Sequence, residues 1–360
     1  QLLNVEDIDL KVQSFNLRNR GKARMLLEPG EGLGESDVHI EITPAPKAEI
    51  TANINNTGSE ETGRQMRSVK GTLYGQIYGT EVIGLSRVDS KTLAVTSATV
   101  DVPLINRDLL LGFGRTEVTN QPINNPVDVN SKSYTTYFQL TRPLVFSPNE
   151  SVDFSVRSSR VTNGTSYLGE TLRSNTTANK LMLGSSYDLF MTNDWSRAKL
   201  TSGVQYTQID TSTLNIANEV TDGRVGKMTF NALYQIDLTS GWGGKVEFSA
   251  QPQRKLMPSA DKFVVGMDNV RAYKPGAGVG DAGRSLSLDL YKTTYIDIDQ
   301  AGTKVLTQPY VFYDNAAVYD GLNNYASKGF KAFGYGIKMP FFAAYKGFSF
   351  DLYRALAISS

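Results

Sequence analysis

The chain has 360 residues, 37 of them basic and 36 acidic, and a formal net charge of +1. This balance excludes a global electrostatic field that would recruit nucleic acid or an anionic membrane surface. Cysteine is absent, which excludes disulfides, thiolate metal sites and cysteine nucleophiles.

Residues 1–46 differ in character from the rest of the chain. A helix is predicted first, because four apolar residues after an N-cap at Asn4 share one helical face: Val5, Ile8, Val12 and Phe15. Two strands follow, "ARMLLEP" and "VHIEIT", joined by the glycine-rich "GEGLGESD". The stiff "PAPK" at residues 44 to 47 marks a domain boundary. A helix and hairpin of this size cannot bury a core unaided, so we expect the second half of a small α/β module.

From residue 47 onward, apolar and polar residues alternate. Leucines at 286, 288 and 290, for example, alternate with Ser287, Asp289 and Tyr291. About fifteen such segments follow one another, most of about ten residues or more. A transmembrane strand needs about 9 to 11 residues, whereas strands of globular proteins average nearer 5 or 6. We therefore predict an antiparallel transmembrane β-barrel over residues 47–360 rather than a β-sandwich.

The barrel is expected to close, because open hydrogen-bonding edges cannot face lipid. An even strand number is usual for bacterial single-chain barrels, so about 16 strands are predicted. No window approaches the roughly 20 apolar residues of a membrane helix, so a helical membrane protein is not expected. The start, "QLLNVEDIDL", lacks the pattern of a signal peptide, and "LYRALAISS" lacks an aromatic-ended last strand. We therefore expect a mature form or a fragment with an incomplete C-terminus.

A glycine-studded loop, residues 256–283, interrupts the strand pattern and carries Arg271. Its glycines keep the backbone permissive, so neither a helix nor a regular strand is predicted there. We expect the loop to fold back into the lumen of the barrel. Its "GAGVGDAG" superficially matches a phosphate-binding loop, but a strand follows where that motif requires a helix.

Catalytic residue types are scarce. His39 is the only histidine of the sequence and is expected at the surface, so no Ser-His-Asp triad is predicted. Inward-facing Asp and Glu residues are expected to line a hydrated lumen rather than to act as an acid and base pair. Tyr and Phe at strand ends favour membrane-interface girdles, with a sugar-stacking track as the alternative. We predict no enzymatic activity, no metal and no cofactor.

Several segments, in chain order, resemble one family. "EDIDLKVQSFN" and "ARMLLEPGEGLGESDVHIEI" resemble the end of the polypeptide-transport-associated (POTRA) domain nearest the barrel in two-partner secretion transporters, the TpsB class. "INNTGSEETGRQ" resembles their first barrel hairpin. "VRAY", "GDAG" and "VFYDNAAVY" resemble the motifs of the inward loop and of the strand that receives it. Alanine replaces the family's usual glycine at Ala272 and Ala316.

The resemblance implies specific roles. Val270, Arg271 and Tyr273 would anchor the loop against Phe312 and Asp314 of the lumen wall. Gly280, Asp281 and Gly283 would shape the turn into the next strand, and Leu26, Val38 and Ile40 would bind the client. The implied function is type V secretion of a large unfolded partner polypeptide, such as a haemolysin or adhesin. The implied location is the bacterial outer membrane, among lipid and lipopolysaccharide, with residues 1–46 in the periplasm, and we expect a monomer.

The pairing of Arg271 with Asp314 also follows from strand phase. An aspartate in a lipid-facing strand must point inward, because charge on the lipid face is costly. Arg271 on an infolded loop would meet it there as a bidentate pair. In a hydrated lumen the pair is expected to position the loop, with loss of Arg271 costing about 1 kcal/mol. An exposed loop with a solvated arginine is the alternative.

Three other functions are compatible with a barrel. An insertase of the same superfamily shares the arginine and aspartate motifs. A solute porin is expected to lack "VRAY" and the POTRA hairpin, and a lipid-modifying enzyme is disfavoured by the absence of histidine from residues 47–360. Fold analogy alone does not choose among them.

Overall fold

The structure is a computed structural model. It describes residues 5–18, 22–30, 36–43, 47–56, 58, 62–75, 81–104, 109–122, 129–147, 149–167, 172–214, 220–252, 255–297, 304–321, 326–340 and 349–358. Within these ranges, no helix has the length and apolar character of a membrane span.

A helix and a hairpin precede the large sheet, as predicted. They are α1 (Val5–Arg18), β1 (Lys22–Pro29) and β2 (Ser36–Thr43), and β1 pairs with β2 antiparallel. The Asn16 side chain joins helix to hairpin, because its Nδ2 donates to Ala23 O at 2.8 Å and its Oδ1 accepts from Ala23 N at 2.6 Å. Val12 of the helix and Ala23 of the hairpin are both buried. The proposed N-cap Asn4 and linker residues 44–46 lie outside the described residues.

One large antiparallel sheet makes up most of the chain. It has sixteen strands, as predicted, and those on the main path follow sequence order. The strands are β3 (Ala48–Asn55), β4 (Met66–Tyr74), β5 (Val82–Asp89), β6 (Leu93–Leu104), β7 (Leu109–Asn120), β8 (Val129–Ser147), β9 (Glu150–Tyr167), β10 (Leu172–Thr192), β11 (Ser196–Leu214), β12 (Val220–Leu238), β13 (Trp242–Gln251), β16 (Ala282–Lys292), β17 (Thr294–Asp297), β18 (Lys304–Asp320), β19 (Ala326–Pro340) and β20 (Ser349–Ile358).

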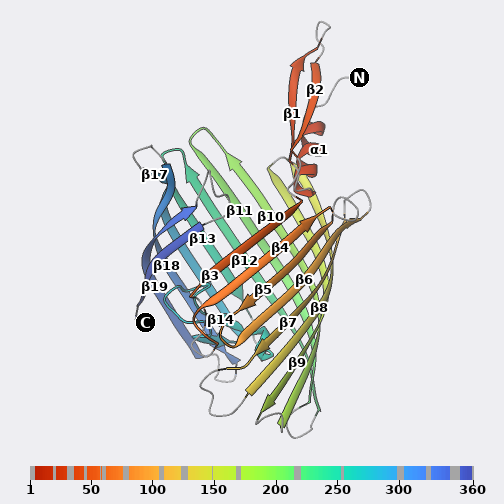
Figure 1. Ribbon diagram of the computed structural model, residues 1–360, viewed down its shortest axis with the longest axis vertical. Helices are drawn as coiled ribbons and strands as arrows, with labels where there is room; N and C mark the ends of the chain where they lie inside the picture. The colour runs from red at the N-terminus through yellow and green to blue at the C-terminus, as the bar shows by residue number, and fades with distance from the viewer. Residues whose placement is uncertain are drawn as a thin grey trace.

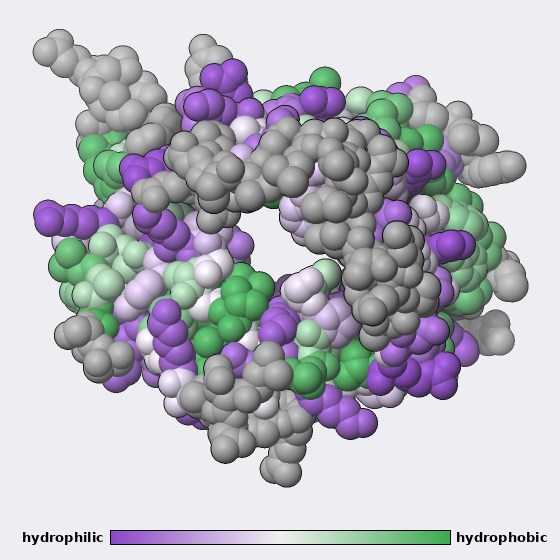
Figure 2. Space-filling view, turned by 90° about the horizontal axis from the view of Figure 1, so that it is seen from below, coloured by the Kyte–Doolittle hydropathy of each residue, from purple (hydrophilic) through white to green (hydrophobic). Residues whose placement is uncertain are grey.

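The sheet curls into a ring around an open middle (Figures 1 and 2). The order runs from β3 at one end to β20 at the other, and β17 lies off this path, paired to β18 just after β16. No pairing of described residues joins β3 to β20. Closure of the ring therefore stays a prediction.

The outer face of the ring carries a band of apolar side chains. Val156, Leu183, Tyr206 and Met228 lie directly opposite one another across β9 to β12 and are between 41% and 48% exposed. Residues opposite each other in register share a face of the sheet, and side chains alternate along each strand. The neighbours of these residues in sequence therefore point into the lumen. The predicted alternation is thus present as an outer apolar band and a polar inner wall.

The loop between β13 and β16 lies inside the ring, where Figure 1 shows β14. It contains a short 3-10 helix, η1 (Ser259–Asp261), and the strands β14 (Phe263–Val265) and β15 (Gly278–Gly280), which pair antiparallel. The prediction of no regular strand here was wrong, because two three-residue strands pair with each other. Since consecutive strands alternate in direction, the loop leaves β13 at the end of the ring opposite the start of β3.

Candidate functional site: the inward loop and its wall

Arg271 at the tip of the loop contacts Asp314 of β18, the pair proposed from the sequence. Arg271 Nε donates to Asp314 Oδ2 at 2.9 Å and Nη2 donates to Oδ1 at 2.7 Å. The main-chain N of Arg271 adds a third bond to Asp314 Oδ2 at 3.0 Å. A bidentate pair with a main-chain bond fixes the orientation of the loop backbone as well as the side chain.

Two residues of β16 complete the arginine site, and sequence reasoning did not assign them to it. Arg271 Nη2 donates to Asp289 Oδ1 at 2.5 Å and to Ser287 Oγ at 2.9 Å. Ser287 Oγ in turn donates to Asp314 Oδ1 at 2.7 Å. The signal was present, because Ser287 and Asp289 occupy the polar phase of the strand that carries the three alternating leucines.

The Arg271 site is buried rather than hydrated, which corrects the expectation from the sequence. The Asp314 side chain is 1% exposed and that of Arg271 16% exposed. The guanidinium lies 3.6 Å above the centre of the Phe312 ring, which covers it from the wall side. Burial disfavours the charged form of Arg271, but hydrogen bonds to Asp314 and Asp289 outweigh this and raise its pKa. The arginine therefore stays charged.

Apolar packing supports the tip on the same side of the lumen. Val270 is fully buried, in a cluster with Phe263 and Val265 of the loop and with residues of β18 and β19. Tyr273 packs edge-on against Phe330 with ring centres 5.2 Å apart. The two alanines that replace family glycines, Ala272 and Ala316, both lie in this contact. Their methyl groups fill the interface without separating loop from wall.

The three residues proposed to shape the loop turn have different roles at the end of the loop and the start of β16. A Cβ on Gly280 would lie 2.7 Å from the main-chain O of Tyr319, so only glycine lets the backbones approach this closely. Asp281 Oδ1 accepts from Met257 N at 2.8 Å, and its Oδ2 accepts from Gly321 N at 2.9 Å. Gly283 belongs to β16 and not to the loop, which corrects the predicted boundary. It pairs with both neighbouring strands, and its missing side chain admits the Phe263 ring.

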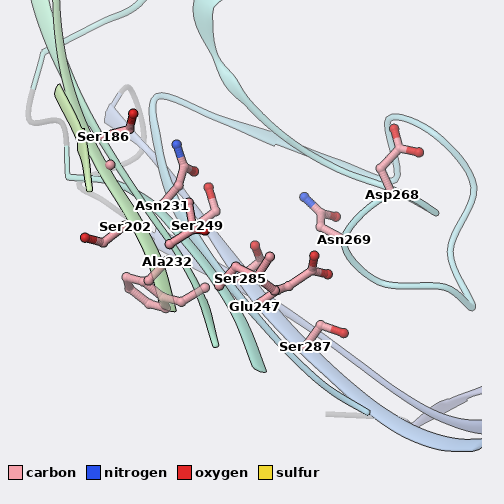
Figure 3. Close-up of a pocket in the computed structure, with 14 residues that line it drawn as sticks. Ser186, Ser202, Asn231, Ala232, Glu247, Ser249, Asp268, Asn269, Ser285 and Ser287 are labelled. Carbon is pink, nitrogen blue, oxygen red and sulfur yellow. The ribbon is translucent and has the colours of Figure 1, made fainter. Parts of the chain in front are cut away.

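An open cavity lies between the loop tip and the wall strands β10 to β13 and β16. Its volume is about 460 Å³, and Asp268 and Asn269 face it from the loop (Figure 3). Most residues of the wall side are small or polar, among them Ser186, Gly203, Asn231, Ser249 and Ser285, and Glu247, Phe248 and Leu233 also line it. The anchored loop therefore covers the β18 and β19 side and leaves this polar wall uncovered.

The three proposed client-binding residues do not share one surface. Leu26 lies opposite His39, whereas Val38 and Ile40 lie opposite Leu27 and Met25 on the other face of the hairpin. Within that second face, Leu27, Ile40 and Ile42 are each about half exposed. The set proposed from the sequence is therefore split between the two faces of the hairpin. The face that carries Val38 and Ile40 is the apolar one.

Among the described residues, no group of three or more histidine, aspartate or glutamate side chains is placed to hold a metal ion. No family model and no curated protein matches the chain.

Solved structures match the chain over nearly its whole length. CdiB from Escherichia coli is 13% identical with a TM-score of 0.76, and the match covers 100% of this chain and 68% of that one. CdiB from Acinetobacter baumannii is 15% identical with a TM-score of 0.71, and the match covers 98% of this chain and 63% of that one. BamA from Haemophilus ducreyi lacking POTRA domains 1–3 is 13% identical with a TM-score of 0.60 over 98% of this chain and 75% of that one.

The chain therefore has the fold of these CdiB and BamA structures. The resemblance predicted from the loop and strand motifs is confirmed at the level of the fold. The chain spans 63% of the length of CdiB from Acinetobacter baumannii. The identity of residues 1–46 as part of a POTRA domain stays a prediction.

Proposed function

We propose that the chain is the membrane part of a bacterial outer-membrane transporter that secretes a large partner polypeptide through its lumen. The observation that carries this proposal is the loop inside the ring, anchored by Arg271 to β16 and β18. CdiB from Escherichia coli, a TpsB transporter whose fold the chain shares over its length, supports the proposal. We propose neither a catalytic role nor a cofactor.

The uncovered polar wall beside the loop tip is the proposed route of the client. Serine and asparagine side chains there offer hydrogen bonds, and the lining also includes the carboxylates of Glu247 and Asp268. An extended polypeptide carries unpaired main-chain groups that need such partners. Movement of the loop tip away from β16 and β18 would widen the route.

The hairpin β1–β2 is the proposed place of client recruitment. Its face with Ile40 and Ile42 is apolar and exposed, and a strand edge of a two-stranded hairpin offers main-chain groups for strand addition. This face would lie in the periplasm, at the end of the ring where β3 begins.

Gene deletion separates the proposed function from its closest alternative. If a large exoprotein is encoded beside this chain, deletion should trap that exoprotein in the periplasm and leave other outer-membrane barrels unchanged. A general loss of assembled barrels would identify an insertase instead. Normal secretion after deletion would contradict the proposal.

Point variants of the full-length protein then test the anchor and the hairpin. Arg271→Ala and Asp314→Asn should each reduce secretion about tenfold or more while the barrel stays folded on a heat-modifiability gel, and the double variant should lose little more. Ile40→Lys should reduce secretion, whereas Leu26→Lys on the opposite face of the hairpin is its control. Additive losses at Arg271 and Asp314 would show that the pair does not act as a unit.

A further inference from the structure

A second cluster of charged side chains holds the base of the loop to a different part of the wall. Asp261 in η1 accepts two bonds from Lys180 Nζ of β10, at 2.7 Å to Oδ1 and 2.8 Å to Oδ2. Lys227 Nζ of β12 lies 3.3 Å from Asp261 Oδ1 and 3.3 Å from its main-chain O. These side chains are between 6% and 16% exposed.

Polar and apolar contacts tie both ends of the loop into this cluster. Gln251 Nε2, at the end of β13, donates to Asp261 O at 3.0 Å and to Asp281 O at 2.9 Å. Met257 packs against Ala178, Ile209 and Val225, which come from β10, β11 and β12. The base is therefore attached to the wall by charge, by hydrogen bonds and by burial.

The base cluster and the Arg271 site share no residue and no wall strand. The Arg271 site uses β16 and β18, and the base cluster uses β10 and β12 together with the end of β13. In the sheet, β11, β12, β13 and β16 lie between β10 and β18. A change at one site thus leaves every contact of the other in place.

We propose that Asp261, Lys180 and Lys227 form a second anchor, a hinge at which the loop stays on the wall when the Arg271 site opens. The tip then swings about its base within the lumen, and the loop as a whole does not leave it. This inference deepens the proposed function, on which its role in transport rests. The anchor itself is measurable without any client.

Loss of Asp261 should release the base because it leaves two buried cations unpaired. Removing one partner of a buried ion pair destabilises a protein far more than removing one partner of an exposed pair. Asp261→Asn keeps the size of the side chain and removes only its charge. Lys227→Met, at the longer of the two lysine contacts, provides a graded variant with an intermediate effect if Asp261→Asn impairs folding.

Single cysteines report on the two anchors separately, because the sequence contains no cysteine of its own. Val265→Cys, buried in the cluster beside the tip, reports on the tip, and Met257→Cys, buried in the cluster at the base, reports on the base. The measurement is the rate at which a maleimide labels each thiol in detergent-solubilised full-length protein. Folding of every variant is followed by heat modifiability.

Opposite labelling patterns are expected. Arg271→Ala should raise labelling at residue 265 about tenfold or more and leave residue 257 within about twofold, and Asp261→Asn should do the reverse. A protein with both Arg271→Ala and Asp261→Asn should show raised labelling at residue 265 and at residue 257. Charge exchange, Asp261→Lys with Lys180→Asp, should restore part of the protection at residue 257. Asp210→Asn is the control, because Asp210 of β11 pairs with Arg224 of β12 in an exposed ion pair on the outer face of neighbouring strands.

Two results would overturn the hinge. Equal exposure of both reporters by Arg271→Ala would show that one anchor holds the entire loop. Protection of residue 257 in both Asp261→Asn and Lys227→Met would show that the charges do not hold the base. Failure of secretion assays with the labelling pattern intact would count against the proposed function alone.

Discussion

At the scale of single residues, burial decides how much a charged pair matters. Strand phase placed Asp314 in the lumen, where a hydrated pair was expected to contribute about 1 kcal/mol. In the structure Arg271 of the loop and Ser287 both bond that carboxylate, which is 1% exposed. Removing one partner of a buried pair costs about 3–5 kcal/mol. When Arg271 is lost, detachment of the tip costs less free energy, because it lets water reach the Asp314 carboxylate.

Asp281 at the base of the loop makes stability depend on pH. Burial by itself raises its pKa, but the amides of Met257 and Gly321 and the Lys262 ammonium outweigh this and hold the pKa below its ordinary value. A lowered pKa stabilises the fold above the unfolded pKa of about 4, and the contribution is lost as pH falls through the folded value.

The Tm of the wild type in detergent should therefore exceed that of Asp281→Asn by the largest margin above about pH 5, and the margin should shrink below about pH 4. Other carboxylates titrate in both proteins and cancel in the difference. A margin that widens as pH falls would contradict the assignment.

The residues predicted from the sequence and those that were missed differ in the information that their prediction requires. Arg271 and Asp314 were found because a motif and a strand phase each fix one partner. Lys180, Lys227 and Asp261 were missed, because a lysine on the polar phase of a strand looks the same whether it meets water or a loop 81 residues away. Only the folded path of the loop distinguishes these cases.

At the scale of elements, the loop is more regular than its composition indicates. Glycines predicted an irregular segment, yet β14 and β15 form a hairpin, and Phe263 of β14 lies over Gly283 of β16. Glycine here removes a side chain where an aromatic ring must fit. The sequence shows the glycine but not the ring that it accommodates.

Gly283→Ala should destabilise this hairpin, because the added Cβ would lie 2.1 Å from Phe263 Cδ1. Overpacking of this kind costs about 1–3 kcal/mol. Gly329→Ala is the control, since a Cβ there meets nothing within 4 Å and should change stability by less than about 0.5 kcal/mol. Denaturant unfolding in detergent measures both, and Phe263→Leu should partly rescue Gly283→Ala. Equal effects of the two alanine variants would show that the ring moves aside freely.

At the scale of the whole molecule, the two faces of one strand should tolerate charge differently. On β10, Leu183 belongs to the outer apolar band, whereas Ser186 points into the lumen beside the polar cavity. A lysine on a lipid-facing position near the midplane of a bilayer costs about 2–4 kcal/mol, falling to about 0–1 near the interface. A lysine in a hydrated lumen loses little solvation.

Leu183→Lys should therefore lower the free energy of unfolding from lipid vesicles by up to about 4 kcal/mol, and Ser186→Lys by less than about 1 kcal/mol. The two sites lie on one strand, three residues apart, so strand propensity and distance from the turn are nearly matched. Urea titration in vesicles measures both values. A neutral Leu183→Lys would mean that the apolar band faces water, and a larger loss at Ser186 would mean that the faces of β10 are reversed. Either result would remove the physical basis for placing the ring in a membrane, and with it the route proposed for the client.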